Sequence, residues 1–229
     1  MSEILKGAWV EKQMVDAHEL ALMSEQALRP IQANEVFAFK IAACDDQIDR
    51  DLERFTSATL DQLAQMFPGR PVLRDHAWSA SSQTARVYAG STETTNGVKR
   101  LILRAYMPCN ETTRPTVDAI ELGILREASV GVSVRQCLCS VCGQDYSTCG
   151  HMRGETYEEK LCHVELDGAE DAYEVSLVAV PAQKEAGVVK RYAQKENRTE
   201  ADGAEECSIL RMAQAMQEME EKRYGGMEV

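Results

Sequence analysis

Residues 84–107, TARVYAGSTETTNGVKRLILRAYM, contain two β-rich runs on either side of Asn96-Gly97. An Asn-Gly pair between two such runs is a strong signal for a two-residue hairpin turn, because both residues tolerate a positive φ. The stretch therefore predicts two antiparallel strands joined by a tight turn.

Helices are predicted on both sides of this hairpin. Residues 56–67 begin with Thr56 or Ser57 as a helix N-cap and carry apolar residues at helical spacing. Residues 113–127 have a proline near their start and an apolar side, and we expect this helix to continue through Gly123.

Further strands are predicted at residues 35–44, 128–136, 161–166 and 173–181. In the second of these, valines alternate with small residues, so that the two kinds occupy opposite faces of the strand. The face without valines carries Ser129, Gly131 and Ser133.

The chain divides into three regions. Residues 1–34 form an N-terminal helical arm, and residues 35–192 form the main folded domain, with a Cys-rich insert at 137–163. Residues 193–229 form an acidic linker followed by a C-terminal helix. We find no internal repeat.

The composition of the chain argues against several classes of function. The 229 residues carry a formal net charge of −12, which argues against nucleic acid as a partner because phosphate binding needs clustered Lys and Arg. No stretch approaches the roughly 18 consecutive apolar residues of a membrane span, and the N-terminal residues are too charged for a secretion signal. We therefore expect a cytoplasmic protein without a membrane partner.

The insert contains a pattern of metal ligands. Residues 137–151 read CLCSVCGQDYSTCGH, in which a C-x2-C pair is followed by a second Cys/His pair after a short loop. Three thiolates and one imidazole suit tetrahedral Zn²⁺. The predicted ligands are Cys139, Cys142, Cys149 and His151.

We expect this zinc to be structural. Four protein ligands leave no coordination position for water, and three thiolates neutralise the Lewis acidity of the ion. Other nearby residues are alternative ligands, and the sequence leaves that choice open. These alternatives are Cys137, Cys162 and His163.

A second set of residues offers the chemistry of a serine hydrolase. His76 is the histidine left over for a general base once the arm and the Cys-rich region are set aside. Ser129 stands beside Gly131, where backbone N–H groups can face an oxyanion. Glu174 enters an apolar strand and needs a partner such as an imidazole. Ser133 and Ser176 are rival nucleophiles.

Three blocks of sequence resemble the tailed-phage prohead maturation proteases. They are PVLRDHAWS (71–79), REASVGVSV (126–134) and YEVSLVAVPAQKEA (173–186), with CDDQIDRDLERFT (44–56) upstream of the first. That family is similar in fold and mechanism to the herpesvirus capsid assembly proteases, and the resemblance covers roughly residues 35–189.

The resemblance implies Ser129 as nucleophile, His76 as general base and Glu174 in the third, orienting position. It implies an α+β fold with a small β-barrel-like core flanked by helices. It also implies self-cleavage and cleavage of scaffold and major capsid protein segments inside immature proheads, in the cytoplasm of a bacterial host.

The Cys-rich insert departs from many members of that family, because it separates Ser129 from Glu174 along the chain. We expect the metal to hold the ends of this long loop together and to support the site at a distance. The alternative function is a non-catalytic, zinc-stabilised capsid-assembly or scaffold protein. A zinc-dependent hydrolase is a third, weaker hypothesis.

Overall fold

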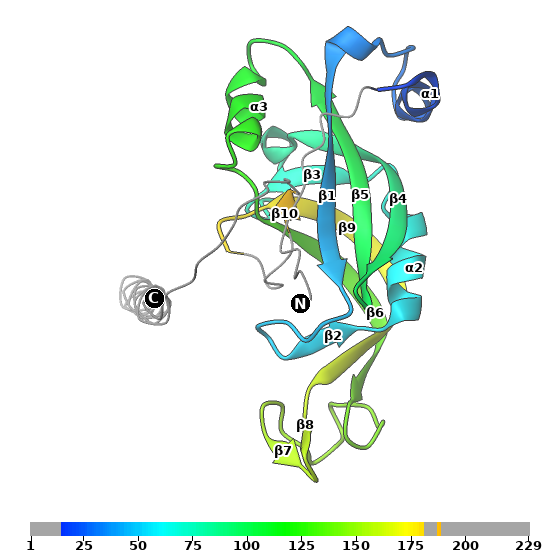
Figure 1. Ribbon diagram of the computed structural model, residues 1–229, viewed down its shortest axis with the longest axis vertical. Coiled ribbons are helices and arrows are strands. Elements are labelled where there is room, and N and C mark those ends of the chain that lie inside the picture. Colours follow the sequence, from blue (N-terminus) through cyan, green and yellow to red (C-terminus); the bar gives the residue numbers. More distant parts are fainter. Residues whose placement is uncertain (1–14, 181–186, 189–229) are drawn as a thin grey trace, which may run out of the picture. The chain divides into compact units, whose positions relative to one another are not determined.

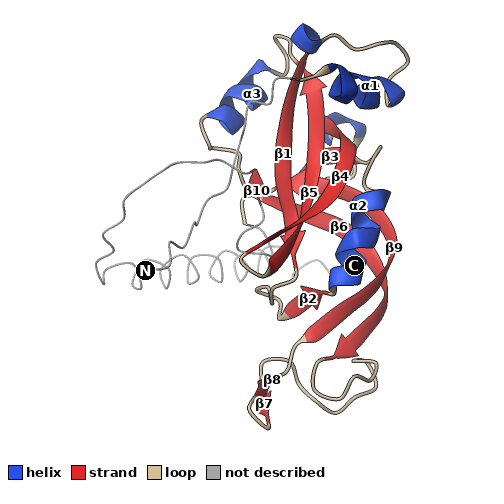
Figure 2. Ribbon diagram, turned by 45° about the vertical axis from the view of Figure 1, so that its right-hand side comes forward, coloured by secondary structure: helices blue, strands red, loops and turns tan. Residues whose placement is uncertain are grey.

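The structure is a computed structural model that describes residues 15–180 and 187–188. Within these residues the chain forms one mixed eight-stranded sheet, a separate two-stranded ribbon and three α-helices (Figures 1 and 2). The predicted α+β class is therefore confirmed. The predicted linker and helix of residues 193–229 lie outside the described residues.

The sheet runs in the order β10-β1-β5-β4-β3-β9-β2, with β6 paired to β9. The ribbon consists of β7 and β8. The strands are β1 (Val36–Asp45), β2 (Glu53–Phe55), β3 (Pro71–Arg74), β4 (Ala85–Thr95), β5 (Val98–Pro108), β6 (Ala128–Cys139), β7 (Thr156–Tyr157), β8 (Lys160–Leu161), β9 (Val164–Leu177) and β10 (Gly187–Val188).

The predicted hairpin of residues 84–107 is β4 and β5. They pair antiparallel, and the turn residues Asn96 and Gly97 have φ values of 54° and 78°. The free side of β5 pairs with β1, which places the hairpin in the interior of the sheet.

Strand β9 joins the parts of the sheet that carry the candidate site. One side of β9 pairs antiparallel with β6 along most of its length, and the other side pairs parallel with β3 and β2. The prediction of two strands at 161–166 and 173–181 was wrong, because β9 is continuous. The polar middle of β9 contains Gly168, which has a φ of 71°. The pairing with β6 shifts register twice, so the strand continues without a break.

The sheet is open, which corrects the expected β-barrel-like core. Among the described strands, no ladder joins β6 to β1 or β10. A cavity of about 310 Å³ lies instead between β1 at Ala43 and Cys44 and β6 at residues 128–134. The two strands therefore face each other across this cavity without pairing.

Helix α2 (Ser57–Met66) covers one face of the sheet, against β4, β5 and β9 (Figure 2). Thr56 is its N-cap, as predicted, and its Oγ1 accepts a hydrogen bond from the Thr59 N–H. Leu60 and Leu63 are fully buried in the main core. Removing a leucine of this kind from water contributes about 2 kcal/mol to folding.

Helix α3 (Arg114–Glu121) is shorter than predicted. The expected continuation through Gly123 was wrong, because Gly123 has a φ of 74°. This left-handed conformation is favoured just after the end of a helix. The chain then leads directly into β6.

Helix α1 (Ala17–Glu25) lies in the predicted N-terminal arm and begins at the N-cap Asp16. Met23 is fully buried in a smaller core with Ala38, Tyr88 and Ala89. No helix of residues 15–180 and 187–188 is long and apolar enough to span a membrane.

Candidate functional site

The structure brings His76 and Glu174 together. His76 follows β3, and Glu174 lies on the neighbouring strand β9. The Nδ1 atom of His76 is 2.7 Å from Oε1 of Glu174. The carboxylate side chain is 1% exposed and the imidazole 43% exposed, so a buried acid holds a histidine that faces solvent.

Ser176 forms hydrogen bonds with both residues of this pair. Its hydroxyl donates to Oε2 of Glu174 at 2.6 Å and accepts a hydrogen bond from the backbone N–H of His76 at 3.1 Å. Both oxygens of the buried carboxylate therefore have a partner, as a buried charge requires. Ser176 is fully buried, which argues against it as the nucleophile.

The backbone at His76 adopts an uncommon conformation. Asp75 and His76 have φ values of 53° and 52°, in the left-handed region that non-glycine residues seldom occupy. The Asp75 N–H donates to the carbonyl of Leu177, and the His76 N–H donates to Ser176. Two consecutive residues of this kind, fixed by hydrogen bonds to one strand, are typical of functional sites.

Ser129 lies on the same sheet face as this pair. It is opposite Ser176 in the β6–β9 ladder, and directly opposed residues of antiparallel strands have Cβ atoms about 5 Å apart on one face. Within the described part of the chain, Ser129 Oγ makes no hydrogen bond to His76. The fold thus brings the serine next to the pair without joining its hydroxyl to the imidazole.

Gly131 provides the space that Glu174 occupies. The two residues are opposite each other in the ladder, and a Cβ at position 131 would lie 2.4 Å from Glu174 Oε1. No side chain fits there while the carboxylate contacts His76. Ser133, the other rival nucleophile, has a buried Oγ without a hydrogen-bond partner among the described residues.

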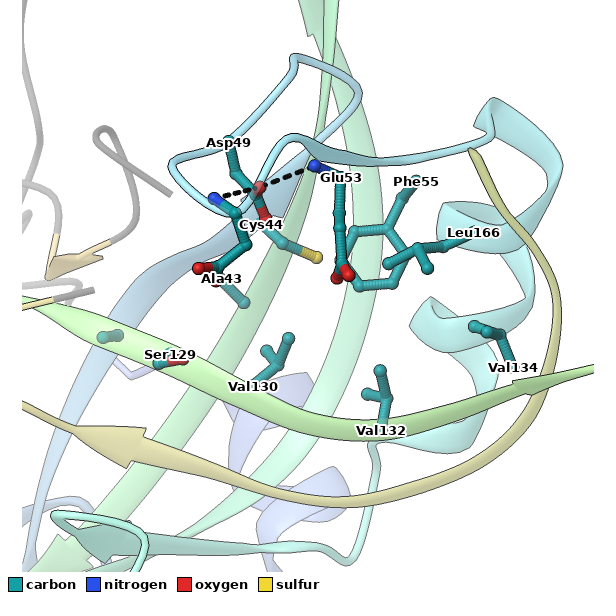
Figure 3. Close-up of a pocket in the computed structure, with 12 residues that line it drawn as sticks. Ala43, Cys44, Asp49, Glu53, Phe55, Ser129, Val130, Val132, Val134 and Leu166 are labelled. Carbon is teal, nitrogen blue, oxygen red and sulfur yellow. Dashed lines mark hydrogen bonds between the residues drawn. The ribbon is translucent and has the colours of Figure 1, made fainter. Parts of the chain in front are cut away.

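The opposite face of β6 borders the 310 Å³ cavity that separates it from β1. Figure 3 shows Val130, Val132 and Val134 pointing into this cavity, with Ser129 at one end. The predicted alternation of β6 is therefore confirmed. The facing wall contains Asp49 and Glu53 together with apolar residues, and Oδ1 of Asp49 accepts hydrogen bonds from the Asp51 and Glu53 N–H groups.

The predicted metal ligands gather in the insert at the far end of β6 and β9 (Figure 1). One ligand atom from each lies within 4.8 Å of all the others, and Cys139 Sγ is 3.7 Å from His151 Nδ1. Tetrahedral zinc has bonds of about 2.0–2.3 Å, which separate its ligand atoms by roughly 3.5–3.8 Å. The cluster of Cys139, Cys142, Cys149 and His151 can therefore hold a metal ion.

The pKa of one thiol in the cluster is suited to metal binding. Burial raises the pKa of the Cys139 thiol, but the backbone N–H groups of Cys142 and Val141 and the neighbouring thiols outweigh burial and lower it to about 6. Burial raises the pKa of Cys149 and, to about 11, that of Cys162. Cys139 is thus the thiol best prepared to act as a thiolate ligand.

The alternative ligands lie outside this group. Cys162 is buried with its Sγ 3.9 Å from Cys139 Sγ, next to the cluster. His163 Nδ1 is 3.1 Å from the carbonyl of Leu161, and Cys137 is exposed.

The sequence analysis missed two features of the site. It considered Ser176 only as a nucleophile, although the i, i+2 spacing from Glu174 puts both side chains on one strand face. It also missed the aromatic pair Trp78 and Tyr173, whose ring centroids are 5.8 Å apart. The only available signal was their position beside His76 and Glu174 in the sequence.

Comparison with protein-family models, with curated proteins and with solved structures gave no match.

Proposed function

We propose that the chain is a serine endopeptidase in which Ser129 is the nucleophile, His76 the general base and Glu174 the residue that orients the imidazole. The observation that carries this proposal is the 2.7 Å contact between His76 Nδ1 and Glu174 Oε1, on the sheet face of Ser129. A histidine oriented by a third group and placed beside a serine is the general device for activating a hydroxyl.

The contact with Glu174 supports a separate role for each nitrogen of His76. With the Nδ1 proton donated to Glu174, Nε2 of His76 is free to act as a base. In the proposed reaction the Ser129 side chain rotates so that its hydroxyl meets Nε2, which takes the proton as Oγ bonds to the peptide carbonyl carbon. Nε2 then gives this proton to the leaving amine as the C–N bond breaks.

Water completes the reaction. Nε2 removes a proton from a water molecule whose oxygen attacks the acyl carbon on Ser129 Oγ, and Nε2 then returns this proton to Oγ as the bond between Oγ and the acyl carbon breaks. Glu174 stabilises the imidazolium that forms in both halves of the cycle. Ser176 holds the second carboxylate oxygen throughout.

The metal is proposed to be Zn²⁺ in a structural role. Three thiolates and one imidazole match the ligand set of structural zinc, which would supply a cross-link within the insert. Ser129 and Cys139 lie near opposite ends of β6, and a strand rises about 3.3 Å per residue, which separates them by roughly 30 Å. The hydrolytic steps are therefore assigned to His76, Ser129 and Glu174 alone.

The biological role is proposed from the sequence resemblance. The blocks around His76, Ser129 and Glu174 resemble those of tailed-phage prohead proteases, which extends the proposal to cleavage of scaffold and major capsid protein segments, and of the chain itself, inside immature proheads.

A fluorophosphonate probe tests the proposed nucleophile without a known substrate. The parent should gain the mass of one probe molecule, mapped to the peptide that contains Ser129. Ser133→Ala, a matched serine on the same strand, should react like the parent, whereas Ser129→Ala and His76→Ala should not. Labelling that persists in Ser129→Ala would overturn the assignment.

Incubation with the capsid protein tests the endopeptidase activity. Intact-mass spectra should show truncation of the capsid protein or of the chain with the parent and none with Ser129→Ala. The missing hydrogen bond between Ser129 and His76 favours, as the second candidate, a non-catalytic capsid-assembly protein with the same fold. Unlabelled parent and stable masses in both samples would support that second function.

A further inference from the structure

Two aromatic side chains are exposed beside the His76–Glu174 pair. Trp78, two residues after His76, keeps 73% of its surface exposed, and Tyr173, directly before Glu174, keeps 38%. Their ring centroids are 5.8 Å apart with an interplanar angle of 55°. Large exposed aromatic residues are uncommon on a protein surface, and a pair of them next to reactive groups points to a ligand.

A β-bulge brings Tyr173 to this position. In the β6–β9 ladder, Gly131 is opposite Glu174 and Val132 is opposite Ala172, so Tyr173 is the extra residue. Strict alternation would direct Tyr173 away from the face of Glu174. Both residues nevertheless line one cavity together with Trp78. The bulge has therefore redirected the tyrosine, as bulges commonly do beside active sites.

The cavity has the size and character of a subsite for one side chain. Its volume is about 270 Å³, slightly below the roughly 300–1,000 Å³ of pockets that enclose whole small molecules. Both oxygens of Glu174 contact His76 and Ser176, so the carboxylate is held at the edge of this cavity by its partners. The remaining lining residues are Pro71, Leu73, Ala80, Ser79 and Gln83.

We infer that this cavity, which we name the Trp78–Tyr173 pocket, receives a large apolar side chain of the substrate peptide, next to the bond that is cleaved. The inference rests on the proposed function, because it takes His76 and Glu174 as the catalytic centre. Glu174 belongs to both sites, so a side chain in the pocket holds the adjoining peptide bond beside His76. The pocket thus selects leucine-like or phenylalanine-like residues over small ones.

A binding experiment tests the pocket independently of catalysis. The sequence contains two tryptophans, so Trp9→Phe leaves Trp78 as the single tryptophan reporter, and Ser129→Ala prevents turnover. N-acetyl-leucine amide should change the Trp78 emission saturably, whereas N-acetyl-glycine amide should not. Adding Tyr173→Ala should weaken binding of the leucine probe about tenfold, as expected for lost apolar contacts.

The matched control is Leu122→Ala, which removes an exposed apolar side chain from the end of α3. It should leave binding of the leucine probe unchanged. No saturable change with N-acetyl-leucine amide, or equal responses to both probes, would overturn the pocket. Thermal unfolding midpoints of all variants establish that each is folded.

A cleavage experiment separates failure of the pocket from failure of the proposed function. Peptides from a digested bacterial proteome are incubated with the parent, Trp78→Ala and Tyr173→Ala, and the cleaved positions are read by mass spectrometry. The parent should favour large apolar residues at one position, and this preference should fall about tenfold or more in both variants. An unchanged preference would overturn the pocket. Selective probe binding without cleavage by the parent would keep the pocket and reject the protease.

Discussion

Oε1 of Glu174 lies 2.7 Å from Nδ1 of His76, although 98 positions separate the two residues in the chain. The carboxylate is buried behind the imidazole, and its other oxygen is held by Ser176. The pair therefore depends on the register between β3 and β9, in which Leu73 is opposite Ser176.

The charge of Glu174 is expected to matter more for reactivity than for folding. Glu174→Gln keeps the size and an acceptor oxygen but removes the charge that stabilises an imidazolium. We expect fluorophosphonate labelling to slow by about 100-fold or more, with little change in the thermal unfolding midpoint. Glu170→Gln, an exposed change on the same strand, is the control. Labelling of Glu174→Gln within about threefold of the parent would contradict this role.

Gly131→Ala should break the site by steric conflict. The new methyl group would lie 2.4 Å from Glu174 Oε1, in a place where the buried carboxylate cannot move without losing a partner. We expect a loss of about 1–3 kcal/mol in the free energy of unfolding, measured in urea, together with slower labelling. Combining Gly131→Ala with Glu174→Asp should recover part of the stability, because the shorter acid leaves room for the methyl group. Purely additive losses would argue against this contact.

Removal of the metal should lower the stability of the fold, while the labelling of Ser129 should persist. Chelation, or Cys142→Ser, is expected to lower the thermal unfolding midpoint and to make the insert sensitive to an added protease, because a structural metal contributes to folding. Labelling of Ser129 well below the unfolding midpoint should persist. Cys109→Ser, an exposed cysteine outside the cluster, is the control. Loss of labelling with unchanged stability would identify a catalytic metal instead.

Arg104→Ala should destabilise the attachment of α1. Glu19 is 2% exposed, and its Oε1 accepts hydrogen bonds from Arg104 at 2.9 Å and from the Tyr88 hydroxyl at 3.1 Å. Removing the arginine leaves a buried carboxylate without its cation, which typically costs about 3–5 kcal/mol. Arg114→Ala, which breaks an exposed ion pair with Asp118, should cost under about 1 kcal/mol in the same urea titration. Similar losses in both variants would contradict the prediction.

Asp49 should give the free energy of unfolding a measurable pH dependence. Burial raises the pKa of its carboxyl group, against the opposing effect of the Glu53 and Asp51 N–H groups. Above the ordinary Asp value of about 3.9, the unfolded chain has lost a proton that the folded chain still holds, so the free energy of unfolding falls as pH rises. Asp49→Asn should remove this contribution, and urea titrations from about pH 4 to 6 measure the difference. Parallel pH profiles would contradict it.

Local signals predicted the local structure. Asn96-Gly97 predicted the hairpin, and Thr56 predicted the start of α2. The alternation of residues in β6 predicted the two faces of that strand. The cluster of four residues that can hold a metal ion was also predicted, because these residues lie within one short stretch. In each of these cases the decisive interactions join residues that are close in sequence.

Features that depend on distant parts of the chain were not predicted. The continuity of β9 depends on its pairing with β6, and the open form of the sheet depends on the absence of a described ladder between β6 and β1. The contact between His76 and Glu174 is the exception, because a buried acid needs a partner and this need was visible in the sequence. The position of Tyr173 depends on a register shift between two strands, for which the sequence holds no local signal.

The arrangement of the metal ligands has a consequence for a protein exposed to proteolysis. Cys139 and Cys142 precede the loop at residues 143–148, and Cys149 and His151 follow it. With an ion bound, a cut within this loop leaves two fragments that share one metal centre and the β6–β9 ladder. Ser129 then belongs to one fragment and Glu174 to the other, while the strands that carry them remain paired. With an ion bound, we therefore expect the fold to tolerate a nick between its two halves.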